Sequence, residues 1–358
     1  MNQNNIANLR LSSQQIAETK FKTPKEIVGW MGAMQAQDFN MAKWAIGIRL
    51  KNAKEENVDA AINSGEILRT HLLRPTWHFV SAEDISWMIK LTAPRIKSSM
   101  KGRNNQLELS QKVLKKCNTL IGKVLRNGNH LTRKELLNEI NKAKISTDDN
   151  RGSHILMNAE LEGIICSGRM KNKQITYALL DERISKPKVV HKEEALGMLA
   201  RKYFESHCPA TLPDFIWWSG LSATEAKLAL EIIKGDFISQ KIGSEEYWFP
   251  YSFSFPKKFK ESIFLLPAFD EFLISYKDRS AAIIFEHQKK AFSNNGIFWP
   301  VIVANGVAVG TWKREIKKDK IIIETNFFDQ KNITPKSIQK EAGKFGYFLN
   351  LKPEIILK

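Results

Sequence analysis

Hydrophobic and polar positions repeat one arrangement three times along the chain: two helical stretches, then a pair of short strands. In the first copy, Thr23-Pro24-Lys25-Glu26 has the residues of a capping box with proline at the first helical position, which predicts a helix over residues 24–33. A second helix is predicted over residues 58–63. Residues 67–72 and 76–80 follow as the two strands of a hairpin.

The second copy begins at another capping box, Thr132-Arg133-Lys134-Glu135, and continues with a predicted helix over residues 152–163. It ends in strands at residues 164–167 and 175–179, and the turn between them, residues 169–173, is basic. Two helices and a hairpin with a cationic tip are the pattern of a winged helix.

The third copy has the punctuation of a helix-turn-helix. Thr211-Leu212-Pro213-Asp214 caps a helix, Ser219-Gly220-Leu221 makes a tight turn, and Ser222-Ala223-Thr224-Glu225 caps the next helix. Residues 237–249 are predicted as its wing. Winged helices bind proteins as well as DNA, so one copy by itself does not identify the partner.

After about residue 256 the pattern changes to strands. Residues 301–303 and 307–310 flank Asn305-Gly306, the strongest short signal for a hairpin. We therefore predict an α+β fold with three tandem winged-helix (helix-turn-helix) modules and a C-terminal, β-rich, barrel-like domain. The predicted modules span residues 1–105, 106–185 and 186–255, and the C-terminal domain spans residues 256–358.

The charge balance narrows the class of partner. The 358 residues include 55 Lys+Arg against 38 Asp+Glu, a formal net charge of +17. Basic residues spread along the whole chain favour a nucleic-acid surface over a short membrane-binding tail. A generally basic proteome is the alternative explanation. Together with the three modules, the charge predicts double-stranded DNA as the partner of a monomer that has no evident dimerisation coiled coil.

Residue spacing argues against several other classes. Cys117, Cys166 and Cys208 are far apart and no CxxC pair exists, so neither a zinc site nor a disulfide framework is indicated. We expect no metal and no other cofactor. The first residues lack an apolar signal core and no stretch approaches 18 apolar residues. We expect a cytoplasmic, nucleoid-associated protein with no membrane partner.

The candidate chemistry lies in Gln35-Ala36-Gln37, which follows the first predicted helix. Side-chain amides do not titrate at neutral pH, but they orient water, which suits hydrolysis of a bond whose leaving group departs easily. Two polar residues at a helix end are the structural alternative. Residues two apart point roughly 200° from each other on a helix but share a face of an extended segment. We therefore predict that the helix ends before Gln35.

In these motifs the chain resembles the AlkZ-like winged-helix DNA glycosylases over nearly its whole length. The resemblance is carried by Gln35-Ala36-Gln37 with residues 42–49, by residues 69–80, by residues 214–221, by residues 265–270 with Asp278-Arg279, and by residues 305–312. It implies three winged helices and a β-barrel around a concave DNA-binding face, and excision of alkylated purines, in some members with unhooking of interstrand crosslinks. Before His78 this chain has Pro75-Thr76-Trp77, where the family often has glycine-threonine-leucine. This difference bears on which lesions are accepted more than on the type of reaction.

The resemblance also implies a Gln-x-Gln catalytic motif, at Gln35 and Gln37. Glycosidases use two carboxylates because the sugar oxygen is a poor leaving group. A purine alkylated at N3 or N7 is already cationic and departs as a neutral base, so two amides that hold a water suffice. Asp38 and His78 are candidates to line the site, and for each a purely structural role is the alternative.

We expect DNA contacts from six cationic residues: Arg69, Arg74, Arg151, Lys171, Lys173 and Arg279. We expect Trp217 and Trp218 in the core rather than stacked on bases. No lysine is placed for a Schiff base, which favours a monofunctional glycosylase. The alternatives are a non-catalytic winged-helix DNA-binding protein, either a transcription regulator or a damage sensor, and an RNA-binding or scaffold protein.

Overall fold

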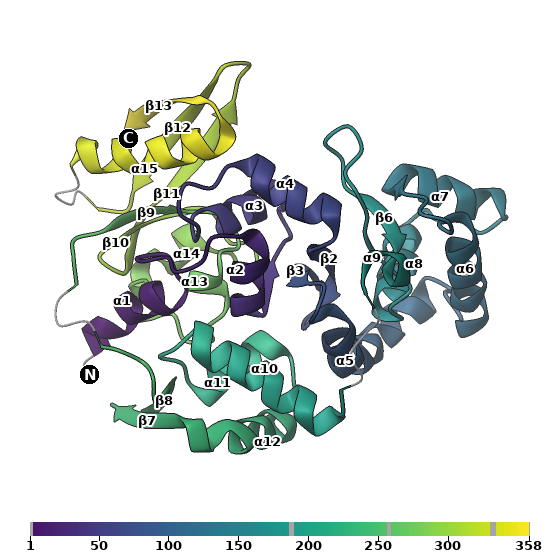
Figure 1. Ribbon diagram of the computed structural model, residues 1–358, viewed down its shortest axis with the longest axis horizontal. Helices are drawn as coiled ribbons and strands as arrows, with labels where there is room; N and C mark the ends of the chain where they lie inside the picture. The colour runs from purple at the N-terminus through teal and green to yellow at the C-terminus, as the bar shows by residue number, and fades with distance from the viewer. Residues whose placement is uncertain (1–2, 186–189, 256–258, 330–333, 358) are drawn as a thin grey trace.

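The computed structural model describes residues 3–185, 190–255, 259–329 and 334–357 (Figure 1). Its first unit contains α1 (Gln3–Ser13), α2 (Pro24–Met31), β1 (Ala33–Gln35), α3 (Phe39–Gly47), α4 (Glu55–Ser64), β2 (Ile67–Leu72), β3 (Thr76–Ser81) and α5 (Ile85–Gln106). The three strands form an antiparallel sheet in the order β1-β3-β2. The capping box at Thr23 and the hairpin β2–β3 are confirmed.

The second unit repeats this arrangement. It contains α6 (Gln111–Val124), β4 (Leu131–Thr132), α7 (Arg133–Lys142), α8 (Arg151–Leu161), β5 (Ile165–Ser167), β6 (Thr176–Leu179) and α9 (Leu180–Arg183). Its antiparallel sheet has the order β4-β6-β5, and the capping box predicted at Thr132 is present. In Figure 1 this unit forms a lobe at one end of the molecule, on the far side of the first unit from the C-terminal sheet.

The third unit consists of helices followed by one two-stranded sheet. It contains α10 (Lys192–Ser206), α11 (Leu212–Ser219), α12 (Ala223–Ile233), the 3₁₀ turn η1 (Lys234–Asp236), β7 (Phe237–Ile242) and β8 (Glu245–Pro250). Both predicted capping boxes, at Thr211 and Ser222, are present. The expectation for the tryptophan pair is confirmed for Trp218, which is fully buried, and wrong for Trp217, which is 40% exposed.

The C-terminal part is built on a five-stranded sheet of order β13-β12-β11-β10-β9. It contains β9 (Ile263–Leu266), α13 (Glu271–Ile274), η2 (Phe285–His287), α14 (Gln288–Ala291), β10 (Val301–Ala304), β11 (Val307–Ile316), β12 (Lys320–Phe327), α15 (Pro335–Leu349) and β13 (Lys352–Leu357). The β10–β11 hairpin turns at Asn305-Gly306 as predicted, with positive φ at both residues. The described strands form a curled half-barrel with edges β9 and β13, which confirms a β-rich, barrel-like sheet that is not closed.

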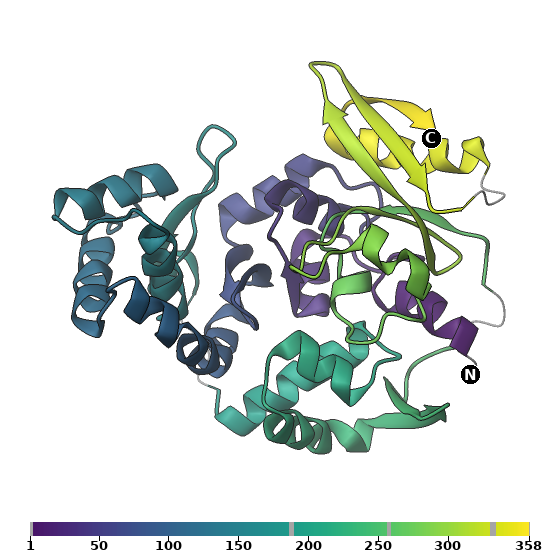
Figure 2. The ribbon, with the colours of Figure 1, turned by 180° about the vertical axis from the view of Figure 1, so that it is seen from behind.

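The first unit contacts both the third unit and the C-terminal sheet. From α3, the indole N–H of Trp44 donates to the Leu265 carbonyl of β9 at 2.9 Å, and its ring packs on Phe345 of α15. The buried Arg49 pairs with Asp270 at 2.8 Å. On the other side, residues of β2, β3 and α5 share one hydrophobic core with α10, α11 and α12. Figure 2 shows the first unit in this central place from behind.

Candidate active site

The Gln35-Ala36-Gln37 motif leaves its helix before the first glutamine, as predicted. Helix α2 ends at Met31, and Gly32 adopts a φ of +77° that turns the chain into β1. Gln35 pairs with His78 of β3, and the Ala36 N–H donates to the Trp77 carbonyl at 2.7 Å. After Ala36 the chain leaves the sheet, so Gln35 is buried at its end while Gln37 is exposed.

Gln35 is held through both its backbone and its side chain. Its backbone N–H donates to Oε1 of Glu271 at 2.5 Å. Its side-chain Oε1 accepts from Nη2 of Arg74 at 3.3 Å. Gln35 therefore joins its own strand, β1, to two distant segments, the β2–β3 turn and the start of α13.

Glu271 was missed by the sequence reasoning, although it directly follows the residues 265–270 of the resemblance. Its side chain is 2% exposed, accepts a hydrogen bond from the Ser275 hydroxyl, and lies 3.8 Å from Nε2 of His207. Burial raises the pKa of Glu271, but its neighbours, the His207 ring first and then the Ser275 hydroxyl and the Gln35 N–H, outweigh burial and lower that pKa to about 2. Glu271 is therefore an anion at neutral pH.

His78 lies directly opposite Gln35 in the β1–β3 pairing, so both side chains project from the same face of the sheet. The ring is fully buried, and burial lowers the pKa of His78 to about 4. Nδ1 lies 3.0 Å from the Thr76 carbonyl and therefore carries the proton. Among the described residues Nε2 has no partner, so a neutral imidazole presents an unused acceptor on the Gln35 face.

Asp38 and Arg69 both support the local structure of the motif. Asp38 is the N-cap of α3 and accepts the Met41 N–H at 3.0 Å, which accounts for an aspartate at this position. Arg69 is buried, its Nε donates to the Ala36 carbonyl at 3.0 Å, and its guanidinium lies 4.3 Å from the Trp77 ring centroid. Arg69 therefore holds the backbone between the two glutamines.

The candidate DNA contacts in the second unit lie at the start of α8 and in the β5–β6 turn. Arg151 at the start of α8 donates to the carbonyls of Ser146 and Leu107. Lys171 and Lys173 are both exposed in the β5–β6 turn, and Lys171 pairs with Glu135 at 2.6 Å.

Arg74 and Arg279 converge on Trp217. Their guanidinium carbons lie 5.5 Å and 5.2 Å from the centroid of that ring. The Trp217 indole N–H donates to the Ile274 carbonyl at 2.8 Å, which fixes the ring against α13. Because α13 also supplies Glu271, this aromatic and cationic group lies beside Gln35.

A family model described as DNA glycosylase AlkZ-like matches residues 28–346 of this chain. The chain belongs to that family of DNA glycosylases. It is 22% identical over 350 residues to the interstrand DNA cross-link repair glycosylase of Streptomyces sahachiroi, covering 93% of each protein. The solved structure of Streptomyces sahachiroi DNA glycosylase AlkZ has the same fold, with a TM-score of 0.80, 19% identity and coverage of 99% of this chain and 100% of that one.

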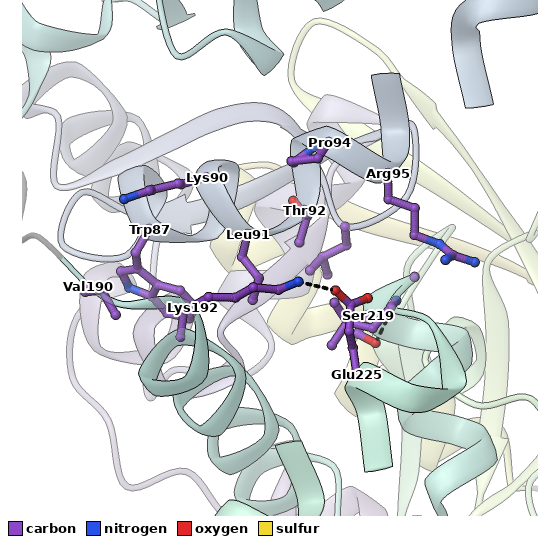
Figure 3. A pocket seen from close by; sticks show the side chains of 14 residues that line it. Trp87, Lys90, Leu91, Thr92, Pro94, Arg95, Val190, Lys192, Ser219 and Glu225 are labelled. Carbon is purple, nitrogen blue, oxygen red and sulfur yellow. Dashed lines mark hydrogen bonds and ion pairs between the residues drawn. The ribbon is translucent and has the colours of Figure 1, made fainter. Parts of the chain in front are cut away.

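This AlkZ-like glycosylase also has a cavity of about 250 Å³ at the junction of its first and third units (Figure 3). Trp87, Leu91 and Pro94 of α5 line one side, and an ion pair of 2.8 Å between Lys192 and Glu225 crosses the other. The glutamines of the motif and Glu271 are not among its lining residues. The cavity is therefore separate from the candidate active site.

Two further observations concern the described part of the chain. It has no cluster of His, Cys, Asp and Glu side chains arranged to hold a metal ion. Within the same residues, no helix combines the length and the apolar character needed to cross a membrane.

Proposed function

We propose that this protein is a monofunctional DNA glycosylase that hydrolyses the N-glycosidic bond of purines alkylated at N3 or N7, including purines joined in interstrand crosslinks. One observation carries the proposal: Gln35 lies at the end of an extended strand, anchored between Arg74 and the buried anion Glu271, with Gln37 exposed two residues later. An anchored amide and an exposed amide two residues apart are suited to holding one water.

The two amides have different parts in this mechanism. The Oε1 atom of Gln35 already accepts from Arg74, so its Nε2 is the group that remains to donate to the water oxygen. Gln37, beyond the end of the sheet, accepts a hydrogen bond from the water through Oε1, and the proton that the water gives up after attack passes to bulk solvent. Such a water needs little deprotonation, because the cationic purine leaves as a neutral base before much bonding to the water has formed. Orientation then supplies most of the acceleration.

Glu271 contributes electrostatically in this mechanism. As the purine leaves, positive charge moves onto the sugar, and a buried anion behind β1 favours that charge without needing to move. Glu271 accepts the backbone N–H of Gln35, so its carboxylate is not placed to attack the sugar as a nucleophile. Neutral His78, with Nε2 unused, adds an acceptor on the same face of the sheet.

DNA binding, in this proposal, uses the helix-and-hairpin units as winged helices with the predicted module boundaries. A net charge of +17 supports contact with phosphates along the duplex. The β5–β6 turn that carries Lys173 and the β11–β12 turn point to the same edge of the molecule in Figures 1 and 2. Both turns belong to one chain, so in this proposal a monomer presents them to one duplex of chromosomal DNA.

The direct test is incubation of the protein with methylated genomic DNA, followed by chromatography of released bases. We expect free methylated purine and abasic sites in otherwise uncut strands, with no product trapped by borohydride, because no lysine acts as a nucleophile. A crosslinked duplex should be unhooked, so that its strands separate on a denaturing gel, one with an abasic site and the other still carrying the adduct. Tight binding to one sequence without base release from any alkylated duplex would instead support the regulator or damage sensor.

A further inference from the structure

Arg74 and Arg279 come from different parts of the fold and meet at one exposed indole. Arg74 lies in the β2–β3 turn, Arg279 follows α13, and Trp217 belongs to α11. Trp217 is 40% exposed, so this group reaches the surface beside Gln35. The rings of Phe292 and Phe298 lie 5.1 Å from the Arg279 guanidinium and form an apolar wall behind it.

Both guanidinium groups have hydrogen-bonding capacity to spare. Each has five N–H donors. To other described residues, Arg74 gives one hydrogen bond, to Gln35 Oε1, and Arg279 gives two, to the carbonyls of Leu273 and Lys277. Nε of Arg74 and Nη2 of Arg279 are buried without a partner in the described part of the structure.

The carboxylates around the two arginines already have other partners. Glu271, whose charge acts on Arg74, accepts the Gln35 N–H and the Ser275 hydroxyl. Asp214 pairs with Arg10 and accepts the backbone N–H groups of Thr211 and Lys277. Asp278 accepts the N–H and the hydroxyl of Ser280. Within the described residues neither Arg74 nor Arg279 forms an ion pair.

Two cations held together in this way favour an anionic ligand. Burial lowers the pKa of both arginines, and the charge of Arg74 helps to lower the pKa of Arg279 to about 10. A bound anion would raise the pKa of both arginines and relieve the repulsion between their charges. A phosphodiester presents two non-bridging oxygens, one for each planar guanidinium, and DNA is the polyanion that the net charge favours.

We propose that Arg74 and Arg279 clamp a single DNA phosphate of the lesion strand over Trp217, and that Arg74 thereby couples phosphate binding to the orientation of the Gln35 amide. This rests on the proposed function for the identity of the ligand. The Arg74 guanidinium donates to Gln35 Oε1 and has further N–H groups available. A phosphate bound to those groups therefore fixes the position of the guanidinium that orients the Gln35 amide. The clamp therefore places the target sugar and prepares Gln35 together.

The test is a binding scan with duplexes that carry one methylphosphonate at each position of the lesion strand in turn. Neutralising the clamped phosphate should weaken wild-type binding about 10-fold, as for loss of a charge-assisted contact. Arg74→Gln and Arg279→Gln should each weaken binding to the all-phosphate duplex by a similar factor. At that one position, the methylphosphonate should weaken each variant by a smaller factor than it weakens the wild type, because only one guanidinium remains there to lose its contact. Arg103→Gln removes an exposed arginine whose guanidinium donates to Gln106 on the same helix, and it should remain additive with the methylphosphonate at every position.

Additivity at every position for both arginine variants, or two different positions for the two variants, would overturn the clamp. The binding scan needs no base release, so an inactive protein with a shared phosphate would refute the proposed function and leave the clamp standing. Active enzyme without a shared phosphate would refute the clamp alone. For the coupling, Arg74→Gln should lower the single-turnover rate at saturating DNA by a larger factor than Arg279→Gln, and equal factors would contradict it. Thermal unfolding of each variant reports whether it is folded.

Discussion

Glu271 accepts the backbone N–H of Gln35 at 2.5 Å although the two residues are 236 positions apart in the chain. The contact joins the first β-strand of the fold to the C-terminal part, and it places a buried carboxylate behind the motif. The same carboxylate is surrounded by donors that hold it as an anion. In the proposed mechanism this contact gives the motif both its extended conformation and its negative environment.

Glu271→Gln should therefore slow base excision by about 10–10²-fold at saturating DNA, less than loss of a group in direct contact with the reacting water. An amide oxygen can still accept the Gln35 N–H, so the change mainly removes charge. Glu341→Gln is the matched control, because it removes a buried carboxylate that pairs with Lys344 on its own helix. Single-turnover kinetics of the two variants should differ, and equal rates would remove Glu271 from the mechanism.

Gly220 fixes the approach of α11 to the β2–β3 turn. Its φ is +68°, and an added Cβ would lie 2.6 Å from the Leu73 carbonyl oxygen. Gly243 has a similar φ of +61° with open space around it. Gly220→Ala should be less stable than Gly243→Ala by about 1–3 kcal/mol in urea unfolding, and it should bind DNA more weakly because Trp217 is displaced from Arg74. Equal free energies of unfolding for the two variants would show that the Leu73 carbonyl leaves room for a Cβ at position 220.

Acid should destabilise the fold partly through His78. Its pKa is about 4 in the folded protein against an ordinary value of 6.5, so between these pH values the unfolded chain binds a proton that the folded chain does not. The free energy of unfolding therefore falls as the pH drops from 6.5 towards 4, and one such histidine contributes about 1.4 kcal/mol per pH unit. His78→Gln should reduce the measured slope by that amount. An unchanged slope would mean that His78 is protonated in the folded state.

Binding of duplex DNA should depend strongly on salt. If about 6–10 phosphates are contacted, affinity should fall about 10³–10⁵-fold between about 50 and 200 mM salt. Lys171→Ala with Lys173→Ala should weaken binding to all duplexes equally and reduce the salt slope by about 1–2, with the larger part from Lys173, because Lys171 is paired with Glu135. A loss confined to one sequence would indicate base readout.

Much of the fold was readable from local signals. The capping boxes at Thr23, Thr132, Thr211 and Ser222 mark four helix starts because each places a side chain on its own backbone three residues later. Asn305-Gly306 marks a hairpin for the same local reason. By contrast, α1 is buried on most sides, including at Arg10 and Ser13, and so has no amphipathic pattern. Strand β13 is a short edge strand with Pro353, and its parallel pairing with β12 is not encoded locally.

The candidate site was only partly readable, for a related reason. The spacing of Gln35 and Gln37 required the helix to end before Gln35, which is confirmed, although β1 itself ends at Gln35 and Gln37 lies beyond it. The partners of Gln35 come from distant positions, Arg74 and Glu271, and no local pattern connects them to the motif. Exposure of Trp217 beside the fully buried Trp218 likewise depends on how α11 packs against α13.

The most direct measurement is single-turnover release of 7-methylguanine from a defined duplex by the wild type and by Gln37→Ala, at DNA concentrations that saturate both. We expect the variant to be slower by about 10²–10³-fold, as for loss of one preorganised hydrogen-bond partner. Its DNA affinity and melting temperature should change little, because Gln37 is exposed and binding is spread over many cationic contacts. Gln35→Ala should behave similarly, and the double variant should be less than additive because both amides hold one water. Wild-type rates in Gln37→Ala, or no base release by the wild type under conditions where it binds the duplex, would contradict the mechanism.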